Sequence, residues 1–152
     1  MDERAQAFWR RFLADTGRDE SLAPYECFSF HNNEACANAL LALVLSGKKR
    51  ATSSSVEGLH LLGLPLPEAG SLSVVTDWAG IPHCVIETES VQIVPFDKMT
   101  FELAGLEGED ETLDSWREGH RRFFTAEGRE LGYDFSETMP VAFETFRVVY
   151  RN

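Results

Sequence analysis

Long apolar segments are absent from this sequence. Its longest apolar runs, such as Ala39–Leu45, are far shorter than the about 20 residues that cross a bilayer. The amino terminus begins with mixed charges and lacks the apolar segment of a secretory signal. We therefore expect no membrane association and predict a cytoplasmic protein.

Cysteine is also scarce. Cys27, Cys36 and Cys84 are widely spaced and contain no C-x-x-C pair, which argues against a disulfide framework and against a zinc ribbon. The histidines show no metal-ligand spacing, and the acidic segment 107–111 is interpreted as a solvated loop. We therefore predict three small buried cysteines, no metal site and no cofactor.

Basic residues are few relative to acidic ones. The chain has 14 Lys and Arg against 25 Asp and Glu, a formal net charge of −11, which disfavours non-specific binding to long nucleic acids. DNA is therefore not an expected partner. Two basic clusters remain, Lys48–Arg50 and the group of Arg117, Arg121 and Arg122, and we interpret the second as a solvated face.

The composition is otherwise that of a folded protein. With 152 residues, 43% of them hydrophobic, the chain has the usual size of one compact domain and can bury a core without disulfides. We predict a single domain over residues 1–152.

Local patterns predict alternating helices and strands. Ala5, Phe8, Trp9 and Phe12 have helical spacing and are followed by Gly17, which predicts an amino-terminal helix with an aromatic stripe facing the core. Further helices are predicted from a cap at Asn32 or Asn33 to Ser46, over 96–106, and from a cap at Thr112. Strands are predicted at 25–30, 50–55, 71–76, 83–94 and 141–150, and a loop at 58–70.

The order of these elements indicates the fold class. They show no regular βαβ rhythm and no glycine-rich phosphate loop, which argues against Rossmann and P-loop folds. The two strands around residues 77–82 are typical of a hairpin. We therefore predict an α+β domain with an antiparallel, barrel-like sheet flanked by helices.

A cation and hydroxyls lie where the second helix leads into a strand. Gly47 is followed by Lys48, Lys49, Arg50 and Ala51, and then by a hydroxyl run over 52–55. In an extended strand Thr52 and Ser54 would share one face, opposite Ser53 and Ser55. This pattern alone is weak, because lysines near helix ends and hydroxyl-rich strands are common.

The same residues resemble the G-x-K-x-x-T signature of the ASCH (ASC-1 homology) family, whose members have a PUA-like β-barrel. The resemblance to longer bacterial members extends over about residues 28–149. It rests also on the segments Ala37–Ser46, Gly80–Pro82, Ala104–Glu109 and Thr112–Phe124. Unlike the short members, this chain has Ser54 where an arginine often follows the motif, and its acidic loop is longer.

The resemblance implies a function and a site. Small bacterial ASCH proteins hydrolyse the acetyl amide of acetylcytidine with a lysine, a threonine and a glutamate, which fall here on Lys49, Thr52 and Glu107. An acylated nucleoside such as N4-acetylcytidine is therefore the expected substrate. Two alternatives stay open: a non-catalytic module that binds RNA or a nucleotide, and a metal-dependent single-strand ribonuclease. A homodimer is also left open.

Chemistry assigns a role to each of these residues. Thr52 would be the nucleophile, Lys49 the base that takes its proton and then stabilises the oxyanion, and Glu107 the proton carrier to the leaving amine. The alternative is a buried Lys49–Glu107 ion pair with Thr52 hydrogen-bonded to it. In both cases the three side chains should lie within hydrogen-bonding reach, directly or through one water. Expected substrate-binding residues are Lys48, Arg50, Ser54 and, as a stacking platform for a nucleobase, Trp78.

Overall fold

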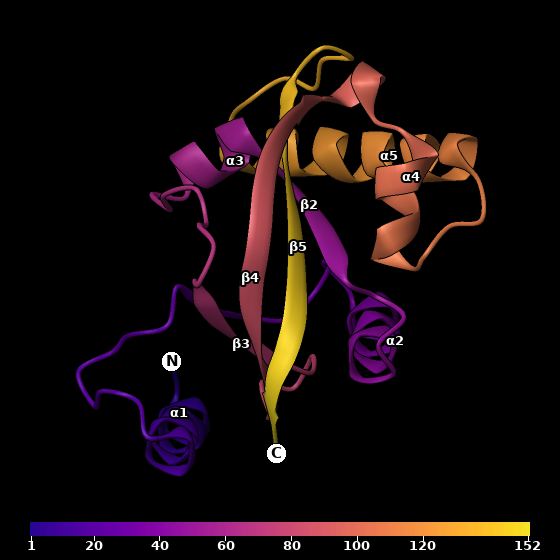
Figure 1. Ribbon diagram of the computed structural model, residues 1–152. Helices are drawn as coiled ribbons and strands as arrows, with labels where there is room; N and C mark the ends of the chain where they lie inside the picture. The colour runs from indigo at the N-terminus through magenta and orange to yellow at the C-terminus, as the bar shows by residue number, and fades with distance from the viewer.

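One curled sheet forms the centre of the molecule, as shown by a computed structural model that describes residues 1–152 (Figure 1). Its strands are β1 (Glu26–Phe28), β2 (Ala51–Ser55), β3 (Leu72–Thr76), β4 (Pro82–Pro95) and β5 (Pro140–Arg151). They lie in the order β1-β3-β4-β5-β2. The edge strands β1 and β2 do not pair, so the sheet is an open half-barrel.

The predicted α+β class and barrel-like antiparallel sheet are confirmed, and the predicted hairpin is formed by β3 and β4. One pairing was not foreseen. The short strand β1 runs parallel to β3, with Glu26 opposite Ser73 and Phe28 opposite Val75. A pairing between such distant segments leaves no local signal in the sequence.

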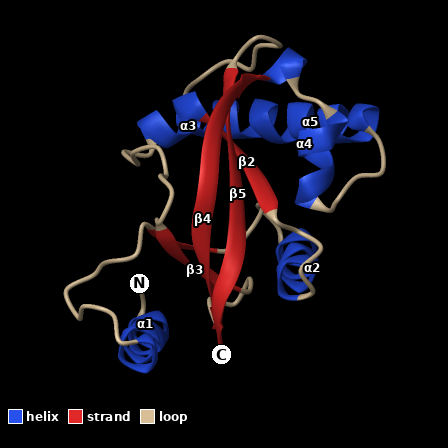
Figure 2. Cartoon of the chain, viewed as in Figure 1, coloured by secondary structure: helices blue, strands red, loops and turns tan.

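Helices surround the sheet (Figure 2). They are α1 (Glu3–Thr16), α2 (Glu34–Leu45), α3 (Val56–Leu61), α4 (Phe101–Ala104) and α5 (Leu113–Leu131), with 3₁₀ turns η1 (Phe96–Lys98) and η2 (Gly105–Glu107). Asn33 and Thr112 cap α2 and α5 as predicted, since their side chains accept the backbone N–H groups of Cys36 and Ser115. None of the helices combines the length and apolar character needed to cross a bilayer.

Two local predictions were wrong. The expected loop at 58–70 begins inside α3, because the Ser55 hydroxyl accepts the Gly58 N–H and caps a helix there. The expected helix over 96–106 is broken into η1, α4 and η2. Met99 and Thr100 interrupt it with extended ψ values of 139° and 157°, and the Thr100 side chain caps α4 by accepting the Leu103 N–H.

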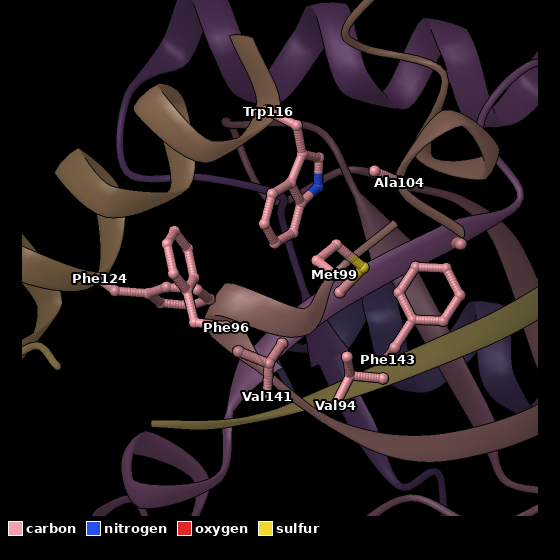
Figure 3. Packing of buried hydrophobic residues seen from close by; sticks show 9 residues of the cluster. Val94, Phe96, Met99, Ala104, Trp116, Phe124, Val141 and Phe143 are labelled. Carbon is pink, nitrogen blue, oxygen red and sulfur yellow. The ribbon is translucent and has the colours of Figure 1, made fainter. Parts of the chain in front are cut away.

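The core consists of three apolar clusters. The largest lies between β2, β4, β5 and α5 and surrounds Trp116 (Figure 3). The predicted aromatic stripe of α1 packs against β3 and β4, and α2 closes the third cluster. Of the three cysteines, all of them free, only Cys84 is fully buried, so the prediction of buried cysteines was wrong for Cys27 and Cys36.

Candidate functional site

Lys49 is turned into the protein by the end of α2. Gly47 adopts a left-handed φ of 81°, and the N–H groups of Lys48 and Lys49 both bond to the carbonyl of Leu43. This tight turn brings the Lys49 side chain inward, where the residue is only 1% exposed. Burial of a lysine to this extent is rare unless its charge is paired.

The Lys49 ammonium is held by carboxylates and a carbonyl. Nζ donates to the Ala51 carbonyl at 2.8 Å and to Oε2 of Glu109 at 2.7 Å, and it lies 3.6 Å from Oε1 of Glu107. It also lies 5.3 Å from the centroid of the Phe30 ring. The expected Lys49–Glu107 pair is thus present, and Glu109, which sequence reasoning placed in a solvated loop, is the closer partner.

Glu107 is positioned by close docking of η2 onto the segment that carries Lys49. The Arg50 N–H donates to the Leu106 carbonyl at 2.9 Å, and the following Gly108 has φ of 74°. A Cβ at Gly108 would lie 2.5 Å from the Lys48 carbonyl oxygen. Only glycine allows this approach without a shift of the backbone.

The buried Glu107 carboxylate accepts several hydrogen bonds. Oε2 accepts from Ser53 Oγ at 2.9 Å and from the Trp116 indole N–H at 2.6 Å. Figure 3 shows the indole nitrogen on the side of the ring that faces Ala104. Ser53, which was not among the predicted site residues, therefore holds the carboxylate, whereas Thr52 makes no side-chain hydrogen bond to Lys49 or Glu107.

His120 completes the site. Its ring stacks on Trp116 with centroids 4.0 Å apart, and Nδ1 lies 2.8 Å from the Trp116 carbonyl. Because that oxygen only accepts, Nδ1 carries a proton, and Nε2 faces Oε1 of Glu107 at 3.4 Å. Trp116 and His120 are four residues apart on α5, and this helical spacing was the available sequence signal for the role of His120.

The pKa values of Glu107 and His120 are shifted apart. Burial raises the pKa of Glu107, but the His120 hydrogen bond, the Lys49 charge and the Trp116 N–H outweigh it and lower the pKa to about 2. Burial lowers the pKa of His120. The hydrogen bond to Glu107 and the negative charge of the Glu107 carboxylate outweigh burial, so that the pKa of His120 is raised. A protonated His120 balances the site, with two cations facing Glu107 and Glu109.

Thr52 lies at the wall of the same cavity. The cavity has a volume of about 260 Å³ and is lined by Lys49, Thr52, Glu107 and His120 among others. Thr52 is paired in register with Glu144 of β5, and antiparallel partners project to the same face of a sheet. The structure thus brings the predicted three residues to one cavity, without direct contact between Thr52 and the other two.

The predicted substrate-binding residues are not gathered there. Lys48 and Arg50 are exposed, and neither lines the cavity. Trp78 is 45% exposed at the β3–β4 turn, where its backbone N–H bonds to Asn38, and it borders a different hollow near the amino terminus. Ser54 lines a second cavity, in the half-barrel, which adjoins the first through Thr52 and Ser53. The structure contains no group of three or more His, Cys, Asp or Glu that could hold a metal ion.

Replacing Gly108 by alanine should loosen this site. Gly47→Ala is the matched control, because Gly47 also has a positive φ but no heavy atom lies within 4 Å of the position that a Cβ would take there. We expect Gly47→Ala to lower the free energy of unfolding by about 1–2 kcal/mol, and Gly108→Ala by about 1–3 kcal/mol more, because of the backbone clash. Urea unfolding measures both. Equal losses would mean that the loop docks less tightly than the structure shows.

Stability should depend on pH in opposite senses for the two coupled groups. The lowered pKa of Glu107 stabilises the fold above its unfolded value of 4.5, and this contribution is lost as the pH falls towards about 2. The raised pKa of His120 stabilises below 6.5, and this contribution is lost as the pH rises through the folded value. In urea unfolding at a series of pH values, His120→Gln should lose the decline above pH 6.5. A decline identical to that of the parent would show that other groups cause it.

Comparisons with known proteins agree with one another. The family model of the ASCH domain matches residues 26–150, and no curated protein matches the sequence. The crystal structure of an ASCH domain from Lactobacillus crispatus JV V101 is 37% identical, with a TM-score of 0.89, over 99% of this chain and 97% of that chain. A crystal structure of a protein from Enterococcus faecalis V583 is 33% identical, with a TM-score of 0.91, over 99% of this chain and 91% of that chain.

Proposed function

The chain belongs to the ASCH domain family, and from this premise we propose that it is a small amidohydrolase acting on an acylated nucleoside such as N4-acetylcytidine. One observation carries the proposal. A hydroxyl and an ammonium from one segment, Thr52 and Lys49, and the carboxylate of the distant Glu107 line a single cavity of about 260 Å³. A nucleophile, a cation for a developing oxyanion and a proton carrier are the groups that amide hydrolysis requires.

The proposed reaction begins at Thr52. Its Oγ attacks the acyl carbon and gives its proton to Lys49, whose charge then faces the oxygen that becomes negative. The C–N bond breaks, the leaving nitrogen takes up a proton from the pair of Glu107 and His120, and the acyl group remains as an ester on Thr52. Water hydrolyses this ester, so that one amide and one water yield one carboxylic acid and one amine.

The contacts of Lys49 add a condition to its role as base. An ammonium has no lone pair, so one of its protons must first move to an acceptor. The nearest carboxylate is that of Glu109, whose Oε2 lies 2.7 Å from Lys49 Nζ. The Glu109 side chain is 25% exposed, so it can exchange that proton with solvent. We assign Glu109 this role of proton acceptor.

His120, whose pKa is raised, has a place in the same scheme in its protonated form. Its Nε2–H faces Oε1 of Glu107, and a carboxylate with a pKa of about 2 is a poor proton carrier by itself. We assign His120, which lines the same cavity, as the source of the proton that reaches the leaving nitrogen, with the Glu107 carboxylate holding the imidazolium in place.

A direct assay tests the proposed function. The purified protein is incubated with N4-acetylcytidine, and products are followed by proton NMR. Equimolar cytidine and acetate should appear, at a rate proportional to protein concentration. Release no faster than in buffer, from protein shown to be folded by circular dichroism, would overturn the proposal.

A further inference from the structure

A second cavity lies in the half-barrel and is not used by the proposed chemistry. It has a volume of about 180 Å³ and receives side chains from all five strands. Phe30, His31, Thr52, Ser53 and Phe123 line both cavities, so the two adjoin at the proposed nucleophile. A substrate whose acyl carbon lies at Thr52 would therefore extend from one cavity into the other.

The charge of this cavity has one sign. Three of its lining residues, Glu26, Glu127 and Glu144, are acidic, and none is lysine or arginine. Glu127 is already engaged, because Ser55 and Tyr133 both donate to its Oε1. The carboxyl groups of Glu26 and Glu144 affect the pKa of the neighbouring Tyr25. Burial, with the charges of Glu26 and Glu144 added, raises the pKa of Tyr25 to about 12.

Several polar groups in this cavity lack partners. Ser73 is 6% exposed and makes no side-chain hydrogen bond, although it lines the cavity. The carboxyl group of Glu26, which is opposite Ser73 in the β1–β3 register, makes no hydrogen bond or ion pair. Glu144 accepts a hydrogen bond only from Thr88. These side chains line the cavity with one protein partner at most, so the hydroxyl groups of a ligand can bond to them there.

We propose that this half-barrel cavity binds the sugar of an unphosphorylated nucleoside, with its hydroxyl groups donating to Glu26 and Glu144 and bonding to Ser73. This inference rests on the proposed function, of which it names the substrate class. Carboxylates recognise ribose hydroxyl groups in dinucleotide-binding proteins in the same way. A protein with these side chains holds the leaving nucleoside on one side of Thr52 and the reacting groups on the other.

The same residues exclude phosphate. A phosphate next to Glu26 and Glu144 would place like charges together, with no lysine or arginine among the lining residues to neutralise them. Nucleotides and RNA carry such phosphates on the sugar itself. The cavity therefore selects a free nucleoside against a nucleotide or an RNA chain.

The first test compares substrates. For N4-acetylcytidine, kcat/KM should exceed that for its 5′-monophosphate by about 10- to 100-fold, and the 2′-deoxynucleoside should show a higher KM with a similar kcat. Glu26→Gln and Glu144→Gln should raise KM for the nucleoside. They should also reduce several-fold the ratio of kcat/KM for the nucleoside to kcat/KM for its 5′-monophosphate. Glu89→Gln, the same charge change at an exposed position of β4, is the control and should change neither. Equal use of nucleoside and monophosphate, with no effect of either variant, would overturn the inference while leaving hydrolysis intact.

The second test separates binding from turnover. Calorimetry with Thr52→Val measures the binding of cytidine and of cytidine 5′-monophosphate directly. Tighter binding of cytidine that weakens in Thr52→Val/Glu26→Gln supports the sugar site even if the assay for hydrolysis fails. No binding of cytidine, or equal binding of the monophosphate, sinks the inference.

Discussion

Replacing Thr52 by valine should abolish hydrolysis of N4-acetylcytidine, with kcat/KM falling by about 10³-fold or more. Valine keeps the shape of threonine but lacks the hydroxyl that attacks the acyl carbon. Thr52 makes no side-chain hydrogen bond to the buried Lys49 and Glu107, so the fold and the ion pair should remain. Steady-state kinetics and urea unfolding together measure the two effects.

Two further variants control this result. Thr52→Ser retains a hydroxyl and should retain part of the rate. Thr145→Val makes the same exchange on the neighbouring strand, at the residue paired with Ala51, and should leave kcat/KM unchanged. Full activity of Thr52→Val would mean that Lys49 and Glu107 activate a water molecule directly.

Replacing Lys49 by methionine should have the largest effect on stability. The side chain is buried and its ammonium contacts both Glu107 and Glu109, so its removal leaves Glu109 without a cation and Glu107 with His120 alone. Breaking a buried ion pair in this way costs about 3–5 kcal/mol. Lys48→Met, at the exposed neighbouring position, should change the free energy of unfolding by less than about 0.5 kcal/mol. Equal effects of the two variants in urea unfolding would contradict the paired burial of Lys49.

Lys49→Arg separates two roles of the same cation. A guanidinium keeps the positive charge but cannot give up a proton near neutral pH. If Lys49 is the base, this variant should lose nearly all activity and still fold. If it retains a substantial part of kcat, the charge alone matters and another group takes the proton from Thr52.

The secondary structure that local signals specify was largely predictable. The helical spacing of Ala5, Phe8 and Phe12, the caps at Asn33 and Thr112, and the hairpin around residues 77–82 each depend on residues close in sequence. The pairing that was missed depends on a distant partner, because the strand predicted at 25–30 forms β1 by pairing in parallel with β3. The interval 96–106 is broken where Met99 and Thr100 adopt extended backbone conformations and Thr100 caps a new helix.

The candidate site divides in the same way. The motif identified Lys49, Thr52 and Glu107 from the sequence, because the family resemblance fixes residue types at these positions. Tertiary structure decided which groups touch them: Ser53 in place of Thr52 at Glu107, Glu109 at Lys49, and His120 behind the carboxylate. It also placed Trp78 away from the cavity.

What the sequence by itself determined is therefore the set of local elements, the acidic balance and the reactive residue types. What only the tertiary structure decided is which distant carboxylates, hydroxyls and cations share one buried volume. The physical reason is range: helix caps, turns and side-chain alternation act over a few residues. The partners of Lys49 and Glu107 depend instead on burial and on contacts between segments more than 50 residues apart.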